Sequence, residues 1–144
     1  MRTIDWNFQN ETVQMIDQRL LPSAIHAALD GQDFPMTTGQ QQRDWIYVAD
    51  VVEGLLAVHQ ASLIPGTTVD LGSGELHSVA SVVRRVYALA GGKGRPLFGT
   101  VPSRPGEETV QRADVVRSKN LTGWETTVSL QNGLSYLMDS FKAP

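Results

Sequence analysis

The chain has 144 residues, of which 41% are hydrophobic and 19% charged, and its 12 basic and 15 acidic side chains give a net charge of −3. Its length suits one domain with a real core, because roughly two thirds of the unfolded surface is buried at this size. The weak negative charge argues against nucleic acid as a general partner. Cysteine is absent, which excludes disulfides and thiolate metal sites and fits a reducing compartment. Neither a membrane span nor a secretion signal is visible, so we expect a cytoplasmic protein.

The first part of the chain is predicted to hold a strand and two helices. Residues 1–19 are rich in Gln, Asn, Thr and Asp, and their spacing fits a short strand over 3–8 followed by a weak helix. The next helix should begin at Leu21-Pro22, because proline suits the first helical position. It should end at Gly31, whose missing Cβ suits a left-handed cap. Residues 34–38 should then be extended.

An apolar helix is predicted after residues 45–48, which form a run of strand type. Asp50 is expected to cap this helix, with Glu53 completing a capping box, and the helix should reach about Gln60. Its apolar side chains cover most of the helix circumference, which favours burial of the helix between two layers of the fold. They are Val51, Val52, Leu55, Leu56 and Val58.

A second strand and helix pair follows the turn at Pro65-Gly66. Residues 67–71 should form a strand that ends at Gly72-Ser73-Gly74. Ser78 can cap the next helix, which Gly91-Gly92 should end. Apolar residues on one face of that helix repeat with helical spacing at Val79, Val82, Val83, Val86 and Ala90.

The last third of the chain is predicted to end in two helices. Residues 96–101 should be extended, and Asp114 can cap a brief helix that reaches Leu121. The final helix should span about Ser129–Phe141, with one apolar face. The predicted order of elements, αβαβαβαα, indicates a mixed α/β fold.

Several short motifs occur in a fixed order along residues 20–141. They are Gly39-x-x-x-Arg43-Asp44 before Asp50, Gly72-Ser73-Gly74 before Ser78, Arg104-Pro105-Gly106-Glu107, Ala113-Asp114, and Gly123-Trp124. In order and spacing this set resembles the C-terminal half of the extended short-chain dehydrogenase/reductase family, the NAD-dependent epimerases and dehydratases of nucleotide sugars. The resemblance implies a partial α/β fold of that family, with few strands and about five helices. Residues 1–19 would be an N-terminal extension, and residues 20–142 the substrate-binding domain.

The same resemblance implies a nucleotide-sugar site at Arg43, Arg104 and Glu107. In family members the two arginines reach the diphosphate, and the acid contacts the nucleoside ribose. A guanidinium makes paired, charge-assisted bonds to phosphate oxygens, and a carboxylate accepts from two neighbouring hydroxyls. The residues alone leave an alternative open. In it Arg43 pairs with its neighbour Asp44, and Arg104 is only a surface residue of a Pro-Gly turn with no ligand.

The cofactor site of the family has no counterpart in this sequence. A dinucleotide site needs a glycine-rich turn, G-x-x-G-x-x-G, between a strand and a helix. The chain has two glycine-dense places, Gly72-Ser73-Gly74 and Gly91-Gly92-Lys93-Gly94, and neither completes that pattern. Both are better interpreted as turns or helix ends. We therefore expect no cofactor-binding residue in the chain.

The catalytic tyrosine and lysine of the family are also missing. Catalysis there needs a lysine four residues after a tyrosine, one helical turn away. The tyrosines Tyr47, Tyr87 and Tyr136 are followed at that distance by Val51, Gly91 and Ser140. The histidines His26, His59 and His77 lack the spacing of metal ligands. The sequence therefore predicts neither catalytic nor metal-binding residues.

The sequence favours a nucleotide-sugar-binding half that is inactive alone. In complete family members, the helix over 50–60 and the strand over 67–71 belong to the cofactor domain. Without the rest of that domain they would expose an apolar helix face and unpaired backbone groups. We expect a homo-oligomer, a symmetric dimer, to cover them. Two alternatives stay open: a truncated fold reused as a self-associating interaction module, and one half of a two-chain enzyme.

Overall fold

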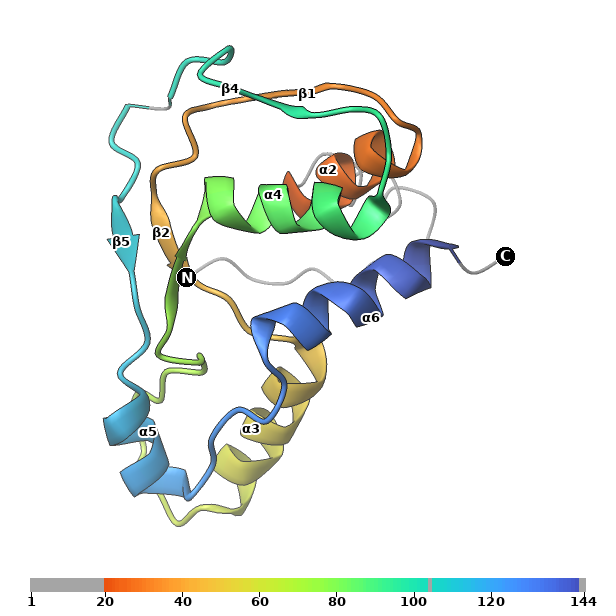
Figure 1. Cartoon of the computed structure of the whole chain (residues 1–144). Helices are drawn as coiled ribbons and strands as arrows, with labels where there is room; N and C mark the ends of the chain where they lie inside the picture. The colour runs from red at the N-terminus through yellow and green to blue at the C-terminus, as the bar shows by residue number, and fades with distance from the viewer. Residues whose placement is uncertain (1–19, 104, 143–144) are drawn as a thin grey trace, which may run out of the picture.

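The computed structural model describes residues 20–103 and 105–142, so the strand and helix expected within residues 1–19 lie outside the described residues. Three helices, α2 (Leu20–Leu29), α4 (Val79–Ala90) and α6 (Leu130–Lys142), pack together, and α3 (Val48–Gln60) and α5 (Val115–Thr122) lie below them in Figure 1. The expected α/β fold, with few strands and about five helices, is confirmed for the described residues. None of the helices in these ranges is long and apolar enough to cross a membrane.

Two small sheets bring distant segments together. In the first, β1 (Phe34–Met36) runs parallel to β4 (Pro96–Phe98). In the second, β2 (Gln42–Asp44) is the central strand, antiparallel to β3 (Leu76–Ser78) and parallel to β5 (Val110–Gln111). Figure 1 shows β5 and β2 side by side at one edge of the molecule. The register places the Cα atom of Arg43 opposite those of His77 and Gln111.

The hydrophobic core lies between α2, α4 and α6. The helix α4 contributes the face that its sequence spacing predicts, and α6 contributes Leu134 and Met138. Each buried aliphatic side chain contributes about 1.5–3 kcal/mol relative to an exposed one, so this three-helix contact holds the fold together. The fully buried apolar side chains, each at most 1% exposed, are Ala24, Ile25, Ala28, Val82, Val83, Val86 and Met138.

The helix ends follow the predicted signals. The Oγ atom of Ser78 accepts from the backbone N–H of Ser81 at 3.1 Å and caps α4. Asp114 caps α5 in the same way, because its Oδ1 atom accepts from the N–H of Arg117 at 3.1 Å. The residue Gly91 ends α4 in the left-handed conformation, with φ of 63°. These three assignments from sequence are confirmed.

Asp50 does not cap α3, so this prediction is wrong. The helix begins earlier, at Val48, which places Asp50 in its first turn. The Asp50 side chain is buried, and its carboxylate accepts from the N–H and Oγ1 of Thr127, at 3.1 and 2.9 Å, and from the N–H of Val128 at 2.9 Å. Burial alone would raise the pKa of this carboxyl, but the hydrogen bonds from Val128 and Thr127 outweigh it and lower the pKa. The carboxylate therefore ties α3 to the segment before α6.

The strands expected over 45–48 and 67–71 are also wrong. The strand near the first range is β2, which ends at Asp44. Residues 67–71 belong to no strand. The N–H of Asp70 donates to the Oγ of Ser118, at 3.0 Å, and Ser118 is only 2% exposed. A buried hydroxyl thus accepts from one amide that a neighbouring strand would otherwise pair with.

The helix α3 is covered on one side only, so the predicted burial between layers is wrong. Gly54 is buried, and a Cβ there would lie 2.7 Å from Leu71 and 3.1 Å from Trp124. The opposite face is open to solvent and carries four apolar side chains. We call these four residues the α3 apolar face: Val48, Val52, Leu55 and Leu56, exposed by 65%, 50%, 57% and 48%. An exposed apolar surface on this helix matches the sequence-based expectation.

Candidate functional site

Arg43 lies on the central strand of the three-stranded sheet and contacts Glu107. Its Nη2 atom is 3.3 Å from the Oε1 of Glu107, and its Nη1 donates to the carbonyl of Gln42 at 2.9 Å. The amide of Gln41 donates to the same Glu107 oxygen at 3.1 Å. The Arg43 side chain is 19% exposed and that of Glu107 is 34% exposed. The pair is therefore partly shielded from water yet reachable by a ligand.

The structure brings together two of the three residues predicted for the site. Arg43 and Glu107 are 64 positions apart in the sequence. Arg104 lies outside the described residues. The alternative in which Arg43 pairs with Asp44 is wrong, because the Asp44 carboxylate accepts from other groups and Arg43 turns toward Glu107. A cationic donor and an anionic acceptor thus lie side by side, which suits a ligand that carries both phosphate and hydroxyl groups.

Asp44 organises the backbone beside Arg43, a role that the sequence reasoning missed. Its Oδ1 accepts from the N–H and Oγ of Ser73, both at 2.7 Å. Its Oδ2 accepts from the N–H of Gly74 at 2.8 Å and from that of Ala113 at 3.2 Å. One carboxylate therefore joins the Gly72-Ser73-Gly74 turn to the residues after β5. The sequence carries a signal for this role, since the backbone amides of a glycine turn such as Gly72-Ser73-Gly74 need a hydrogen-bond acceptor.

An open cavity of about 350 Å³ adjoins this arrangement. Arg43 and Asp44 line it together with Arg112. The Nε of Arg112 donates to the carbonyl of Gly74 at 3.0 Å, which holds this second cation near the first. Sequence reasoning also missed Arg112, because this residue lies between two of the family motifs and belongs to neither. The cavity thus presents two guanidinium groups that can bind an anion, together with the carboxylates of Asp44 and Asp70.

The described glycine turns do not fit a dinucleotide. The N–H groups of Ser73 and Gly74, which would have to face a pyrophosphate, donate to Asp44. A Cβ at Gly72 would collide with Ala113. At the other glycine-dense place, a Cβ at Gly92 would lie 2.7 Å from the carbonyl oxygen of Ala28. The prediction that these glycines form turns and helix ends is confirmed.

A metal site does not emerge from the described residues either. Within the two described ranges, His, Asp and Glu side chains nowhere come together in a group of three that could hold a metal ion.

Sequence comparisons connect the chain to enzymes of sugar nucleotides. Residues 9–72 match the family model described as "NAD dependent epimerase/dehydratase family". UDP-glucuronic acid decarboxylase 1 of Xenopus tropicalis is 29% identical over 131 residues, which is 90% of this chain and 30% of that protein. UDP-glucose 4-epimerase of Neisseria gonorrhoeae is 36% identical over 103 residues, or 70% of this chain and 30% of the relative. The chain thus spans about a third of the length of the curated relatives it matches.

Solved structures extend the likeness to the fold. An epimerase of Methanothermobacter thermautotrophicus matches 87% of this chain and 37% of its own, with a TM-score of 0.80 and 26% identity. UDP-glucuronic acid 4-epimerase of Bacillus cereus, solved with UDP-glucuronic acid and NAD, matches 88% of this chain and 40% of its own, with a TM-score of 0.78 and 25% identity.

Fold and sequence thus agree that the chain is similar to part of the NAD-dependent sugar epimerases and dehydratases. The resemblance to the extended short-chain dehydrogenase/reductase family that was inferred from the motifs is confirmed.

Proposed function

We propose that this chain binds a nucleotide diphosphate sugar, as the substrate-binding part of an epimerase or dehydratase. Arg43 and Arg104 would bind the diphosphate, and Glu107 the ribose. The observation that carries this proposal is the Arg43–Glu107 pair, 3.3 Å apart, beside a cavity that also holds Arg112. The Bacillus cereus relative, solved with UDP-glucuronic acid, supports a uridine nucleotide as the first ligand to test.

The chain alone is proposed to bind its ligand without converting it. Its 144 residues contain no tyrosine with a lysine four positions later, and the described glycine turns do not fit a dinucleotide. In this proposal residues 20–142 form the substrate-binding domain and residues 1–19 an extension of it. Its cytoplasmic location stays a prediction.

Calorimetry can test the binding. The chain is titrated with UDP-glucuronic acid, UDP-glucose and dTDP-glucose, and the Arg43→Gln variant is compared with Arg117→Gln, an exposed arginine on α5. The loss of one charge-assisted contact should raise the Kd about tenfold or more in Arg43→Gln. Arg117→Gln should bind like the parent. The proposal fails if none of the three ligands binds, or if both variants match the parent.

A specific observation favours a second candidate function, self-association. Soluble monomers rarely expose contiguous apolar patches of large area, and the α3 apolar face holds four such side chains on one side of a single helix. We propose that a second copy of the chain covers this face, because a symmetric pair requires no other protein. A module of this kind could assemble through α3 and leave the Arg43 cavity open.

Sedimentation velocity tests this assembly. The chain should sediment as a dimer, and Leu55→Asp should convert it to a monomer, because a charge at the centre of an apolar contact is costly to bury. Glu53→Gln, an exposed change on the same helix, is the control and should leave the dimer intact. A folded monomer at high concentration would exclude the dimer and leave the two-chain enzyme as the alternative.

A further inference from the structure

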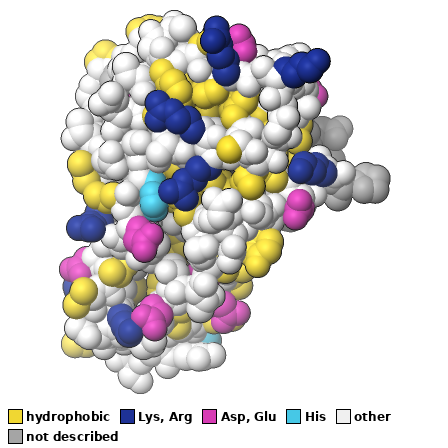
Figure 2. Space-filling model, viewed as in Figure 1, with side chains coloured by type: hydrophobic (Ala, Val, Ile, Leu, Met, Phe, Trp, Pro, Cys, Tyr) yellow, Lys and Arg dark blue, Asp and Glu magenta, His cyan; other side chains and the backbone are white. Residues whose placement is uncertain are grey.

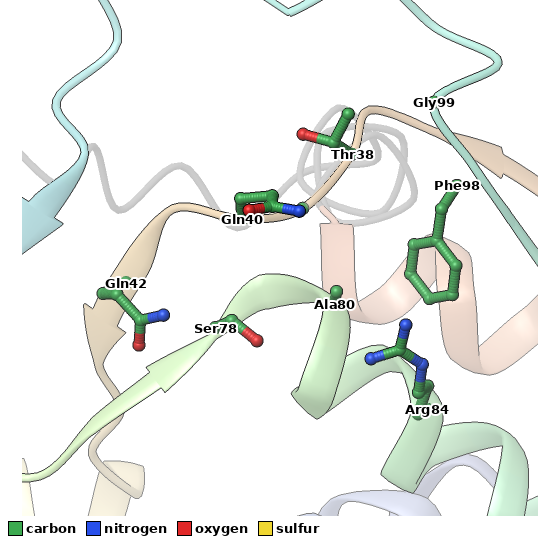
Figure 3. A pocket seen from close by; sticks show the side chains of 9 residues that line it. Thr38, Gln40, Gln42, Ser78, Ala80, Arg84, Phe98 and Gly99 are labelled. Carbon is green, nitrogen blue, oxygen red and sulfur yellow. The ribbon is translucent and has the colours of Figure 1, made fainter.

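A second cavity lies on the other side of β2 from the Arg43 site. It has a volume of about 410 Å³ and lies between the β1–β2 loop, the start of α4 and the end of β4. Successive residues of a strand point to opposite faces, so Gln42 lines this cavity while Arg43 lines the other one. We call it the α4 cavity, and Figure 3 shows its main side chains: Thr38, Gln40, Gln42, Ser78, Arg84 and Phe98.

Three polar side chains of the α4 cavity have no protein partner. Within the described part of the chain, the hydroxyl of Thr38 and the amides of Gln40 and Gln42 make no hydrogen bond to another residue. Their neighbours behave differently, since the amide of Gln41 donates to Glu107 at 3.1 Å. Polar groups of folded proteins are mostly paired with protein or water. Thr38 and Gln40 are exposed and Gln42 is partly buried, so water hydrates these groups and a ligand with hydroxyl groups can replace that water.

Arg84 supplies a fixed positive charge to the same cavity. Its guanidinium carbon lies 4.4 Å from the ring centroid of Phe98, a distance at which the ring face attracts the cation. The Arg84 guanidinium makes no hydrogen bond or ion pair to another described residue, so its N–H groups are free to bind a ligand. None of the described residues that line the cavity is acidic. The guanidinium is therefore placed to bind an anion.

The loop that carries Thr38 and Gln40 is held against α4. Gly39 adopts φ of 65°, and a Cβ there would lie 2.8 Å from the backbone nitrogen of Ala80. That nitrogen donates to the carbonyl of Gly39 at 2.8 Å. The next amide, of Ser81, donates to Ser78, so binding at this cavity depends on side chains and not on the helix end. A loop fixed in this way loses less entropy when it binds a ligand.

We propose that the α4 cavity is a binding site for a sugar phosphate or polyol phosphate. Arg84 would bind the phosphate, and Gln40, Gln42 and Thr38 would bind the hydroxyls, since carboxamides can both donate and accept. The volume is within the range of small-molecule sites, roughly 300–1,000 Å³. Figure 2 shows most of the Lys and Arg side chains of this face in its upper half, where α4 and β4 lie, so the surroundings attract anions. The site is independent of the proposed nucleotide-sugar site.

Two-dimensional NMR of the 15N-labelled chain tests the proposal with three probes, glucose 6-phosphate, glucose and inorganic phosphate. Glucose 6-phosphate should shift the side-chain resonances of Gln40, Gln42 and Arg84, at a concentration about tenfold lower than either fragment. Arg84→Gln should abolish these shifts. Arg85→Gln, a neutralisation of the next arginine on α4, should preserve them.

A further variant separates this site from the Arg43 site. Arg43→Gln should leave the glucose 6-phosphate shifts at α4 unchanged, whatever it does to nucleotide sugars. Phe98→Leu, which keeps an apolar side chain but removes the ring, should weaken binding of glucose 6-phosphate. The proposal is overturned if the sugar phosphate causes no shifts at these residues, or if the shifts survive in Arg84→Gln or vanish equally in Arg85→Gln.

Discussion

Replacement of Asp50 by asparagine should destabilise the fold strongly. The carboxylate is 3% exposed and accepts three hydrogen bonds from Thr127 and Val128. Asparagine keeps one acceptor oxygen but turns an NH2 group toward one of these donors. Loss of a charge-assisted bond contributes about 1.5–3 kcal/mol, and a buried unpaired amide costs about 1–3 kcal/mol. We expect the free energy of unfolding to fall by about 2–4 kcal/mol, a large share of the roughly 5–15 kcal/mol typical of a domain.

Urea unfolding at neutral pH, followed by circular dichroism, measures this change. Asp139→Asn is the matched control, because Asp139 is exposed on α6 and should respond by no more than about 0.5 kcal/mol. Equal unfolding midpoints for the two variants would refute the reasoning.

The same variant has a defined pH dependence. The folded-state pKa of Asp50 is below its ordinary value of 3.8, because burial, which raises it, is outweighed by the hydrogen bonds from Val128 and Thr127. A lowered pKa gives stability that is present above the ordinary value and is lost as the pH falls through the folded-state value. The stability gap between the parent and Asp50→Asn should therefore shrink below about pH 4. A gap that widens in acid would contradict this account of Asp50.

Two further substitutions test local packing. Gly39→Ala should destabilise more than Gly66→Ala in urea, by about 1–3 kcal/mol, because both glycines have positive φ but only Gly39 would press a Cβ against Ala80. Tyr87→Phe should cost about 1 kcal/mol at neutral pH, since the Tyr87 hydroxyl donates to the carbonyl of Gln32 at 2.8 Å. Burial, with the nearby charge of an aspartate, raises the pKa of Tyr87, so its stabilisation is present below pH 10.0 and is lost as the pH rises through the raised pKa. The parent should thus lose stability in alkali in a way that Tyr87→Phe does not, as thermal unfolding from pH 8 to 12 can check.

Local signals in the sequence were sufficient for most of the helices. The cap at Ser78 and the repeat of valines along α4 are properties of a few neighbouring residues, and the structure has both. Asp50 was misassigned because the groups that fill its hydrogen-bonding capacity are 77 and 78 positions away. The strand expected over 67–71 failed for a related reason, since its amide at Asp70 bonds to the side chain of Ser118, a contact that local pattern cannot show.

The candidate site was predictable only through the family motifs. Periodicity and composition give no reason for Arg43 to meet Glu107, and the sheet register that joins them depends on β2 pairing with β5. The roles of Asp44 and Arg112 follow from backbone groups that come close only in the folded chain. A motif comparison finds the residues that contact a ligand more readily than the residues that position them.

The central claim is that Arg43 and Glu107 bind a nucleotide sugar, and a crystal structure of the chain grown with UDP-glucuronic acid tests it most directly. The account predicts the diphosphate at hydrogen-bonding distance, about 3 Å, from the Arg43 guanidinium, with the ribose hydroxyls on Glu107. The account would be contradicted by clear density for the ligand away from Arg43 and Glu107, with the ion pair between these two side chains unchanged.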